Sequence, residues 1–395
     1  MNHPPSITEN EFLTKLAHVK QVLINNESTA IYLHSEGALR WLTGVRHQVI
    51  DIHPCDATTL SVIIKVEKNS YIISFYSEQW EQNRLKDIVR APIFQLEGIT
   101  TTIQPLNALL LDQSIINPHT ENYREIEREI VSPLCEGLNG NQYKKLEFLI
   151  TSSREALLEI GHKLTIGMNG WNLRSLVYET YHNKHIELNQ VVLSLHGMHG
   201  YQHPMVQDDS LIKKGDVIKI VTGSRYYDMI HSATQLVKID SPVSEREHTI
   251  YEALQQMSIT YASQFTTNKT EKELYASLTQ IAQHIEKEYN IPHFSESAHI
   301  HHAGGPISPL GNRDFVITKN GMKKLLPYAQ FSINPVDSIL NLKCELQGIV
   351  IPHDLPIILD EFSHITNKNE YMMVQYNGKD LRLPTIITNS EGYEK

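Results

Sequence analysis

The order of helical and strand-like stretches in the second part of this chain most constrains its fold. Residues 140–164 have strong helical periodicity, and further helical stretches run over about 244–263 and 272–289. Short strand-like runs separate and follow these helices, at 191–195, 217–223, 232–239, 331–335 and 348–352. Helices packed over a curved mixed sheet fit these signals, which predicts an α+β domain.

The first part of the chain alternates helices and strands on a smaller scale. The predicted elements are helices over 9–26, 35–45 and 77–89 and strands over 30–34, 60–66 and 70–76. This alternation indicates a small α/β domain. The polar segment 115–130 is interpreted as the approach to a boundary near residue 140, so the two domains are predicted at 1–139 and 140–395.

Bulk properties exclude several classes of protein. The chain has 395 residues, enough for two domains, and its formal net charge of −10 has no basic block for nucleic acid to bind. No apolar run reaches the roughly 18 residues of a membrane span, and the first residues do not resemble a secretory signal. Cys55, Cys135 and Cys344 form no CxxC pair, which fits a reducing compartment. We therefore expect a cytoplasmic protein without nucleic-acid or membrane partners.

Several motifs occur in a characteristic order. They are RWLTGV at 40–45, LHGMHGYQHP ending at Pro204, the Gly-Asp pair and two strand-like runs within 212–237, HIHHAGGPISPLGNRDF at 299–315 and INPVDSILNLKCEL at 333–346. Together they resemble the creatinase/aminopeptidase P/prolidase family (peptidase M24). The resemblance implies a pita-bread fold for the C-terminal domain, a smaller creatinase-type α/β N-terminal domain, and a homodimer.

The resemblance also implies where metal ligands would lie. The family binds a metal pair through two aspartates eleven residues apart, a histidine after glycine, and two glutamates. The matching positions here are Val221, Ser232, Gly305, Asn334 and Glu345. An aliphatic side chain cannot coordinate a divalent cation, and a lone hydroxyl is a poor ligand. Because only the last position keeps its carboxylate, we expect no metal and no other cofactor.

A shifted alignment is the alternative to this interpretation. Asp216 or Asp228 would then supply a missing ligand, and the chain would be an ordinary Xaa-Pro aminopeptidase-type metallopeptidase. Asp216 matches the Gly-Asp turn that is structural in the family. Asp228 lies four residues before the position at which the second aspartate is expected, Ser232.

Three residues are the catalytic candidates. His203 matches the histidine that creatinase, a family member, uses to hydrolyse a C–N bond without metal; Glu345 is the remaining glutamate; and His301 matches a histidine that handles substrate. A histidine pKa of about 6.5 suits proton transfer near neutral pH. We therefore expect His203 to act as general acid/base, Glu345 to orient it, and His301 to contact substrate. Thr234 replaces a further glutamate of creatinase, so creatine is not the expected substrate.

Other polar residues near these motifs are substrate-binding candidates. They are His302, Arg313, His231, Asn334, Ser232 and Arg46. Each also has a purely structural interpretation: on a strand His231 should face away from Ser232, and Arg313 and Arg46 could be ordinary surface residues. An ion pair with Lys343, two residues away on a strand, would likewise make Glu345 structural.

The sequence leaves the function class open. The leading hypothesis is a metal-independent, creatinase-like enzyme that hydrolyses an amide-type C–N bond in a small nitrogenous molecule. The expected partner is a small-molecule or short peptide substrate. The alternatives are the Xaa-Pro metallopeptidase, a non-catalytic pseudo-peptidase that binds peptides or proteins, and a recruited biosynthetic enzyme with non-hydrolytic chemistry. Acid/base histidines serve many reactions, so the sequence does not decide among them.

Overall fold

The computed structural model contains two compact units. The described residues are 3–45, 57–79, 81–112, 114–131, 134–194, 210–298, 305–307, 310, 317–333, 340, 342, 344, 346–351, 356–358, 370–376 and 379–389. Unit 1 comprises residues 1–145, 227–229 and 308–314, and unit 2 comprises 146–226, 230–307 and 315–395. No helix in the described part of the chain combines the length and apolar character of a membrane span.

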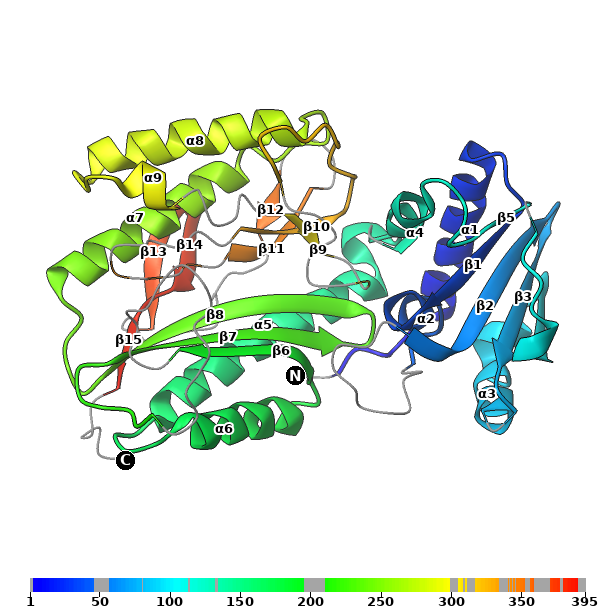
Figure 1. Ribbon diagram of the computed structural model, residues 1–395, viewed down its shortest axis with the longest axis horizontal. Coiled ribbons are helices and arrows are strands. Elements are labelled where there is room, and N and C mark those ends of the chain that lie inside the picture. Colours follow the sequence, from blue (N-terminus) through cyan, green and yellow to red (C-terminus); the bar gives the residue numbers. More distant parts are fainter. Residues whose placement is uncertain are drawn as a thin grey trace. The chain divides into compact units, whose positions relative to one another are not determined.

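Unit 1 is built on a five-stranded sheet with the order β4-β3-β2-β1-β5 (Figure 1). Its strands are β1 (Ala30–Ser35), β2 (Ala57–Glu67), β3 (Ser70–Ser77), β4 (Ile99–Pro105) and β5 (Ile115–Ile116). Strands β1, β2 and β3 pair antiparallel, whereas β4 pairs parallel with β3 at one edge of the sheet and β5 pairs parallel with β1 at the other. The parallel pairs require crossover connections, which the helices of this unit supply.

The helices of unit 1 pack against one apolar core. They are α1 (Glu9–Asn25), α2 (Glu36–Thr43), α3 (Gln82–Val89) and α4 (Tyr123–Val131), with short 3₁₀ turns at Pro92–Gln95, Leu106–Ala108 and Gly137–Asn139. Helix α1 begins where the Thr8 hydroxyl accepts a hydrogen bond from the Glu11 amide, an N-cap. It buries Phe12, whose ring packs edge-on against that of Phe94 with the ring centroids 5.1 Å apart.

Unit 2 contains two four-stranded sheets and a hairpin (Figure 1). The first sheet has the order β15-β8-β7-β6, with β6 (Glu187–Ser194), β7 (Val217–Tyr226), β8 (Met229–Ile239) and β15 (Ile387–Asn389). The second has the order β12-β11-β10-β9, with β9 (Gly305–Ile307), β10 (Gln330–Ile333), β11 (Leu346–Val350) and β12 (Ile357–Ile358). The hairpin pairs β13 (Tyr371–Tyr376) with β14 (Lys379–Pro384).

Helices cover the sheets of unit 2. They are α5 (Asn141–Lys163), α6 (Gly170–Asn183), α7 (Glu245–Ala262), α8 (Glu271–Glu288) and α9 (Phe294–Ala298). Capping boxes begin both α7, at Ser244, and α8, at Thr270. One apolar core joins α7 and α8 to strands β10, β11, β13 and β14 and includes Leu236 of β8.

The elements confirm the predicted α+β class, with two corrections. The three long predicted helices correspond to α5, α7 and α8, within one residue at each end. The polar segment 115–130 contains β5 and most of α4, two elements that the sequence did not predict. Helix α6 was also missed. The domain boundary at 139/140 remains a prediction.

Candidate functional site

The two faces of the β6–β7–β8 sheet are distinguished by side-chain contacts. On β7, the Thr222 hydroxyl lies 2.7 Å from the Tyr181 hydroxyl of α6, and the Ser224 hydroxyl lies 2.8 Å from that of Ser153 of α5. On β8, Val237 packs beside Gly161 of α5. Because side chains alternate along a strand, these contacts assign the even-numbered residues of β7 and the odd-numbered residues of β8 to the face covered by α5 and α6.

The opposite face, here called the inner face, therefore carries Lys219, Val221 and Gly223 of β7 and Ser232, Thr234 and Leu236 of β8. The pairing of β6 with β7 adds Ser194, opposite Lys219, and Val192, opposite Val221. Leu236 belongs to the core formed with α7, α8, β10 and β11, so this face is turned toward the interior of unit 2. Lys219, Val221, Ser232 and Thr234 are all buried.

The inner face brings together two positions singled out from the sequence. Val221 and Ser232, which the sequence resemblance aligns with two aspartate positions, both lie on it. His231 is fully buried, but alternation places it on the face covered by α5, where its carbonyl accepts a hydrogen bond from Ser224. The strand pattern predicted that His231 faces away from Ser232, and the two side chains do lie on opposite faces of the sheet.

The other predicted site residues lie outside the described part of the chain. These are the catalytic candidates His203, Glu345 and His301 and the substrate-binding candidates His302, Arg313, Asn334 and Arg46. Their roles remain predictions.

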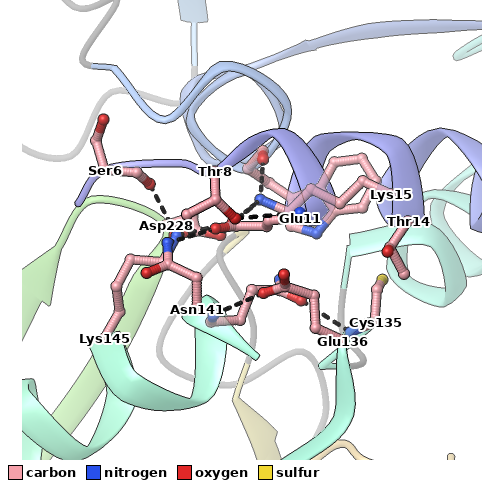
Figure 2. Close-up of polar contacts among 12 residues, drawn as sticks. Ser6, Thr8, Glu11, Thr14, Lys15, Cys135, Glu136, Asn141, Lys145 and Asp228 are labelled. Atoms are coloured by element: carbon pink, nitrogen blue, oxygen red, sulfur yellow. Dashed lines mark hydrogen bonds and ion pairs between the residues drawn. The ribbon is translucent and has the colours of Figure 1, made fainter. Parts of the chain in front are cut away.

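Asp228, a candidate ligand in the shifted alignment, is engaged elsewhere. It lies between β7 and β8 and belongs to unit 1, where its carboxylate contacts the ammonium groups of Lys15 and Lys145 (Figure 2). The Lys15 contact measures 3.0 Å. Glu11 completes this buried ion cluster, at 2.5 Å from Lys15 and 2.9 Å from Lys145. All four side chains are fully buried.

Both lysines of the cluster use all their hydrogen-bond donors. Lys15 donates to Glu11, to Asp228 and to the Trp41 carbonyl, and Lys145 donates to Glu11, to Asp228 and to the Ser6 carbonyl. Burial raises the pKa of Asp228, but the two lysines outweigh it and hold the pKa below its ordinary value. Asp228 is thus a structural residue whose negative charge is compensated by the ammonium groups of Lys15 and Lys145.

Asp216, the other candidate in the shifted alignment, closes a turn. Its carboxylate accepts a hydrogen bond of 2.7 Å from the Lys213 amide, and Gly215 between them has a φ of +85°, which favours glycine. Its side chain lies in the loop before β7 rather than on the inner face. Neither alternative aspartate therefore supplies a ligand at the position of Val221 or Ser232.

The three described strands of the inner face offer no anionic ligand for a divalent cation. Over residues 190–194, 219–223 and 232–236 they contain no Asp or Glu, and they place hydroxyls, aliphatic groups, the carboxamide of Gln190 and the ammonium group of Lys219 on the inner face. Divalent cations are usually held by several anionic oxygen ligands. Nor do three His, Cys, Asp or Glu side chains gather at a metal-binding distance anywhere among the described residues.

Comparison with solved structures shows the fold. A prolidase from Thermococcus sibiricus is 12% identical and matches 95% of this chain and 99% of its own, with a TM-score of 0.64. A dipeptidase from Mycobacterium ulcerans is 13% identical, over 91% of this chain and 98% of its own, with a TM-score of 0.61. An X-Pro aminopeptidase from Thermotoga maritima is 16% identical, over 87% and 96%, with a TM-score of 0.61.

These likenesses confirm the predicted two-domain, pita-bread architecture. No protein-family model matches the chain, and no curated protein has a significant match to its sequence. At these identities the comparisons define the class of fold, and the activities named for the solved structures are properties of those proteins.

Sequence reasoning missed two residues of the inner face. Lys219 lies two residues before Val221, so alternation along a strand was a sufficient signal to place it beside that position. Ser194 could not be found in the same way, because only the register of β6 against β7 places it opposite Lys219. Both are charged or polar side chains in a buried position of the sheet.

Proposed function

We propose that the chain is a metal-independent hydrolase that cleaves an amide-type C–N bond in a small nitrogenous molecule. The observation that carries the proposal is the chemistry of the inner face. The fold resembles that of enzymes named for dipeptide and X-Pro substrates, yet Val221 and Ser232 stand at the two aspartate positions. A fold of this class without anionic oxygens on those strands is suited to proton transfer by side chains.

The proposed mechanism assigns the proton transfers to His203. As general base, its imidazole would remove a proton from water as the water attacks the carbonyl carbon; as general acid, it would return the proton to the leaving nitrogen. Glu345 would accept a hydrogen bond from the other ring nitrogen and fix the tautomer, and His301 would contact the substrate. These three roles rest on the sequence resemblance, as does a homodimer, whereas the expected cytoplasmic location rests on the cysteine pattern and on the lack of a signal-like segment in the sequence.

An Xaa-Pro metallopeptidase is the second candidate function. It is supported by the similarity of the fold to prolidases and an X-Pro aminopeptidase over 87% or more of this chain. The composition of the inner face argues against it, because the two strands that match the family's metal-binding strands contribute a valine and a serine. The two candidates differ in their dependence on metal, which is directly measurable.

The decisive experiment measures metal content and hydrolysis on the full-length protein. After dialysis against manganese, cobalt and zinc in turn, we expect less than one bound metal per chain by elemental analysis. Hydrolysis of a panel of small amides should survive a chelator, whereas Xaa-Pro dipeptides should not be cleaved. Two bound metals per chain together with chelator-sensitive Xaa-Pro cleavage would establish the metallopeptidase instead.

A histidine variant tests the proposed acid/base residue. His203→Gln should lower kcat on the amide substrate by roughly 10²- to 10⁴-fold, the usual contribution of general acid–base catalysis. His248→Gln is the matched control, because His248 lies on α7 with a side chain that is 60% exposed. Equal rates for both variants would remove His203 from the mechanism. No hydrolysis by the wild type, together with tight ligand binding, would identify a binding protein.

A further inference from the structure

We propose that strand β4 is a self-association surface, at which two copies of this chain pair antiparallel about a two-fold axis through Thr101. A homodimer is expected from the sequence resemblance, and the proposal gives that dimer a specific interface. The inference goes beyond the proposed function and requires no assumption about the reaction.

Strand β4 is the long edge of the sheet in unit 1. It pairs with β3 over seven residues without a bulge, whereas β5, at the opposite edge, has only two residues. The structure describes all seven residues of β4, and none of them is buried. The sequence of the strand, ITTTIQP, contains no charged residue, and its one proline is the last residue. Edge strands usually carry charges, a proline or a bulge that prevents pairing with another chain, so residues 99–104 lack these protections.

The backbone of β4 has hydrogen-bonding groups that point away from β3. The Tyr71 amide donates to the Gly98 carbonyl at 2.8 Å, which fixes the alternation of the parallel pair. The amides and carbonyls of the even-numbered residues therefore point toward β3, and those of Thr101 and Ile103 point toward the open edge. No described residue is a backbone partner for the amide of Thr101 or of Ile103. A second strand at this edge would satisfy both groups.

The sequence of this edge reads the same in both directions about Thr101. Residues 99–103 are ITTTI, so an antiparallel pair centred on Thr101 places Thr100 opposite Thr102 of the second copy. Pairs of threonines and pairs of β-branched residues are favourable neighbours across two strands. The two copies of Thr101 would form a hydrogen-bonded pair, because the amide and carbonyl of this residue point outward. The edge therefore fits a second copy of itself in one register.

The same register would cover apolar surface. Ile99 and Ile103 are partly buried and pack against the core of unit 1, so their side chains lie on the core side of the sheet. A two-fold axis perpendicular to the sheet would place Ile99 of one copy beside Ile103 of the other, with the Ile103 amide donating to the Ile99 carbonyl. Five residues from each strand make a small interface, so we expect a reversible dimer with a Kd in roughly the micromolar range.

The experiment measures the Kd of dimerisation of the full-length protein by sedimentation velocity. Two double variants test the register. Thr100→Lys with Thr102→Lys places like charges opposite each other in the proposed pair, whereas Thr100→Lys with Thr102→Glu places opposite charges there. We expect the Kd of the first to be at least about ten-fold higher than that of the second. Equal Kd values, or a wild type that stays monomeric at all concentrations, would overturn the interface.

A proline variant tests the hydrogen bonds of the interface. Thr101→Pro removes an amide that points away from β3, so the pairing of β3 with β4 keeps its hydrogen bonds, and we expect a monomer. In the wild type, exchange of the Thr101 amide should slow as protein concentration rises, whereas that of Thr102, which points toward β3, should not change. If Thr101→Pro does not fold, amide exchange and the double variants still decide. A dimeric Thr101→Pro, or a Thr101 amide whose exchange does not depend on concentration, would refute the pairing.

Discussion

Removal of one anion from the buried ion cluster of unit 1 should strongly destabilise that unit. Asp228→Asn keeps the size of the side chain but leaves Lys15 and Lys145 with only Glu11 as an anionic partner. Each ammonium group has three acceptors in the wild type, and one of the three is Asp228 in both cases. An amide presents only one acceptor atom, so its NH₂ group would face the second lysine.

The expected loss follows from full burial of the cluster. Breaking a buried ion pair by removing one partner costs about 3–5 kcal/mol, because the remaining charge is left without compensation in a region of low dielectric constant. At 1.4 kcal/mol for each factor of ten, the slowest amides of α1 should exchange roughly 10²- to 4 × 10³-fold faster. Hydrogen exchange is the suitable assay because it reports on α1 separately from unit 2.

Matched variants isolate the charge effect. Asp240→Asn is the control, because Asp240 forms an ion pair with the exposed Lys214, and such surface pairs contribute only about 0–1 kcal/mol. Adding Lys145→Met to Asp228→Asn restores electrical neutrality, with Glu11 facing Lys15, and should recover about 2 kcal/mol relative to the sum of the single variants. If α1 exchanged at the same rate in Asp228→Asn as in Asp240→Asn, the stabilising role of the cluster would be refuted.

Two further variants test packing and pH dependence. Gly161→Ala should destabilise unit 2 by about 1–3 kcal/mol in urea unfolding, because the new Cβ would lie 2.3 Å from the Cδ1 atom of Ile387. This clash should outweigh the higher helix propensity of alanine. Ile387→Val removes the Cδ1 atom and should restore part of the loss. Burial raises the pKa of Glu127, although a hydrogen bond from the Tyr123 hydroxyl to its carboxylate acts in the opposite direction. The folded state therefore favours the protonated form of Glu127, and the protein loses stability as the pH rises through the pKa of the folded state. Glu127→Gln should therefore raise Tm near pH 8 and change it little near pH 4, and an equal change at both values would contradict this.

Much of the fold could be predicted from sequence because its long helices have regular apolar periodicity and begin at recognisable caps. Helices α7 and α8 illustrate this, since Ser244 with Glu247 and Thr270 with Glu273 form capping boxes at their starts. Helix α4 was missed because its sequence, YREIEREIV, is mostly charged and buries only a narrow stripe that includes Ile126 and Ile130. A short helix of this composition is hard to distinguish from a polar loop.

The candidate site was harder to predict, because it depends on contacts between distant segments. Resemblance to the family's paired strands identified Val221 and Ser232, and alternation along the strand then separated Ser232 from His231. The buried cluster was not foreseen, although Glu11 and Lys15 are four residues apart on the apolar side of α1, an unusual place for charges. Their partners lie more than a hundred residues away, and no local pattern identifies such pairs.

The buried ion cluster and the composition of the inner face support the metal-independent proposal by separate routes. Both oxygens of Asp228 are bound by lysines, so a shift of alignment cannot bring this residue to the position of Ser232. The composition of the inner face is the second route. Two divalent cations need several anionic oxygen ligands, and β7 and β8 place no carboxylate on this face over 219–223 and 232–236. A metal pair bound by these two strands would therefore require new carboxylates at positions such as Val221 and Ser232.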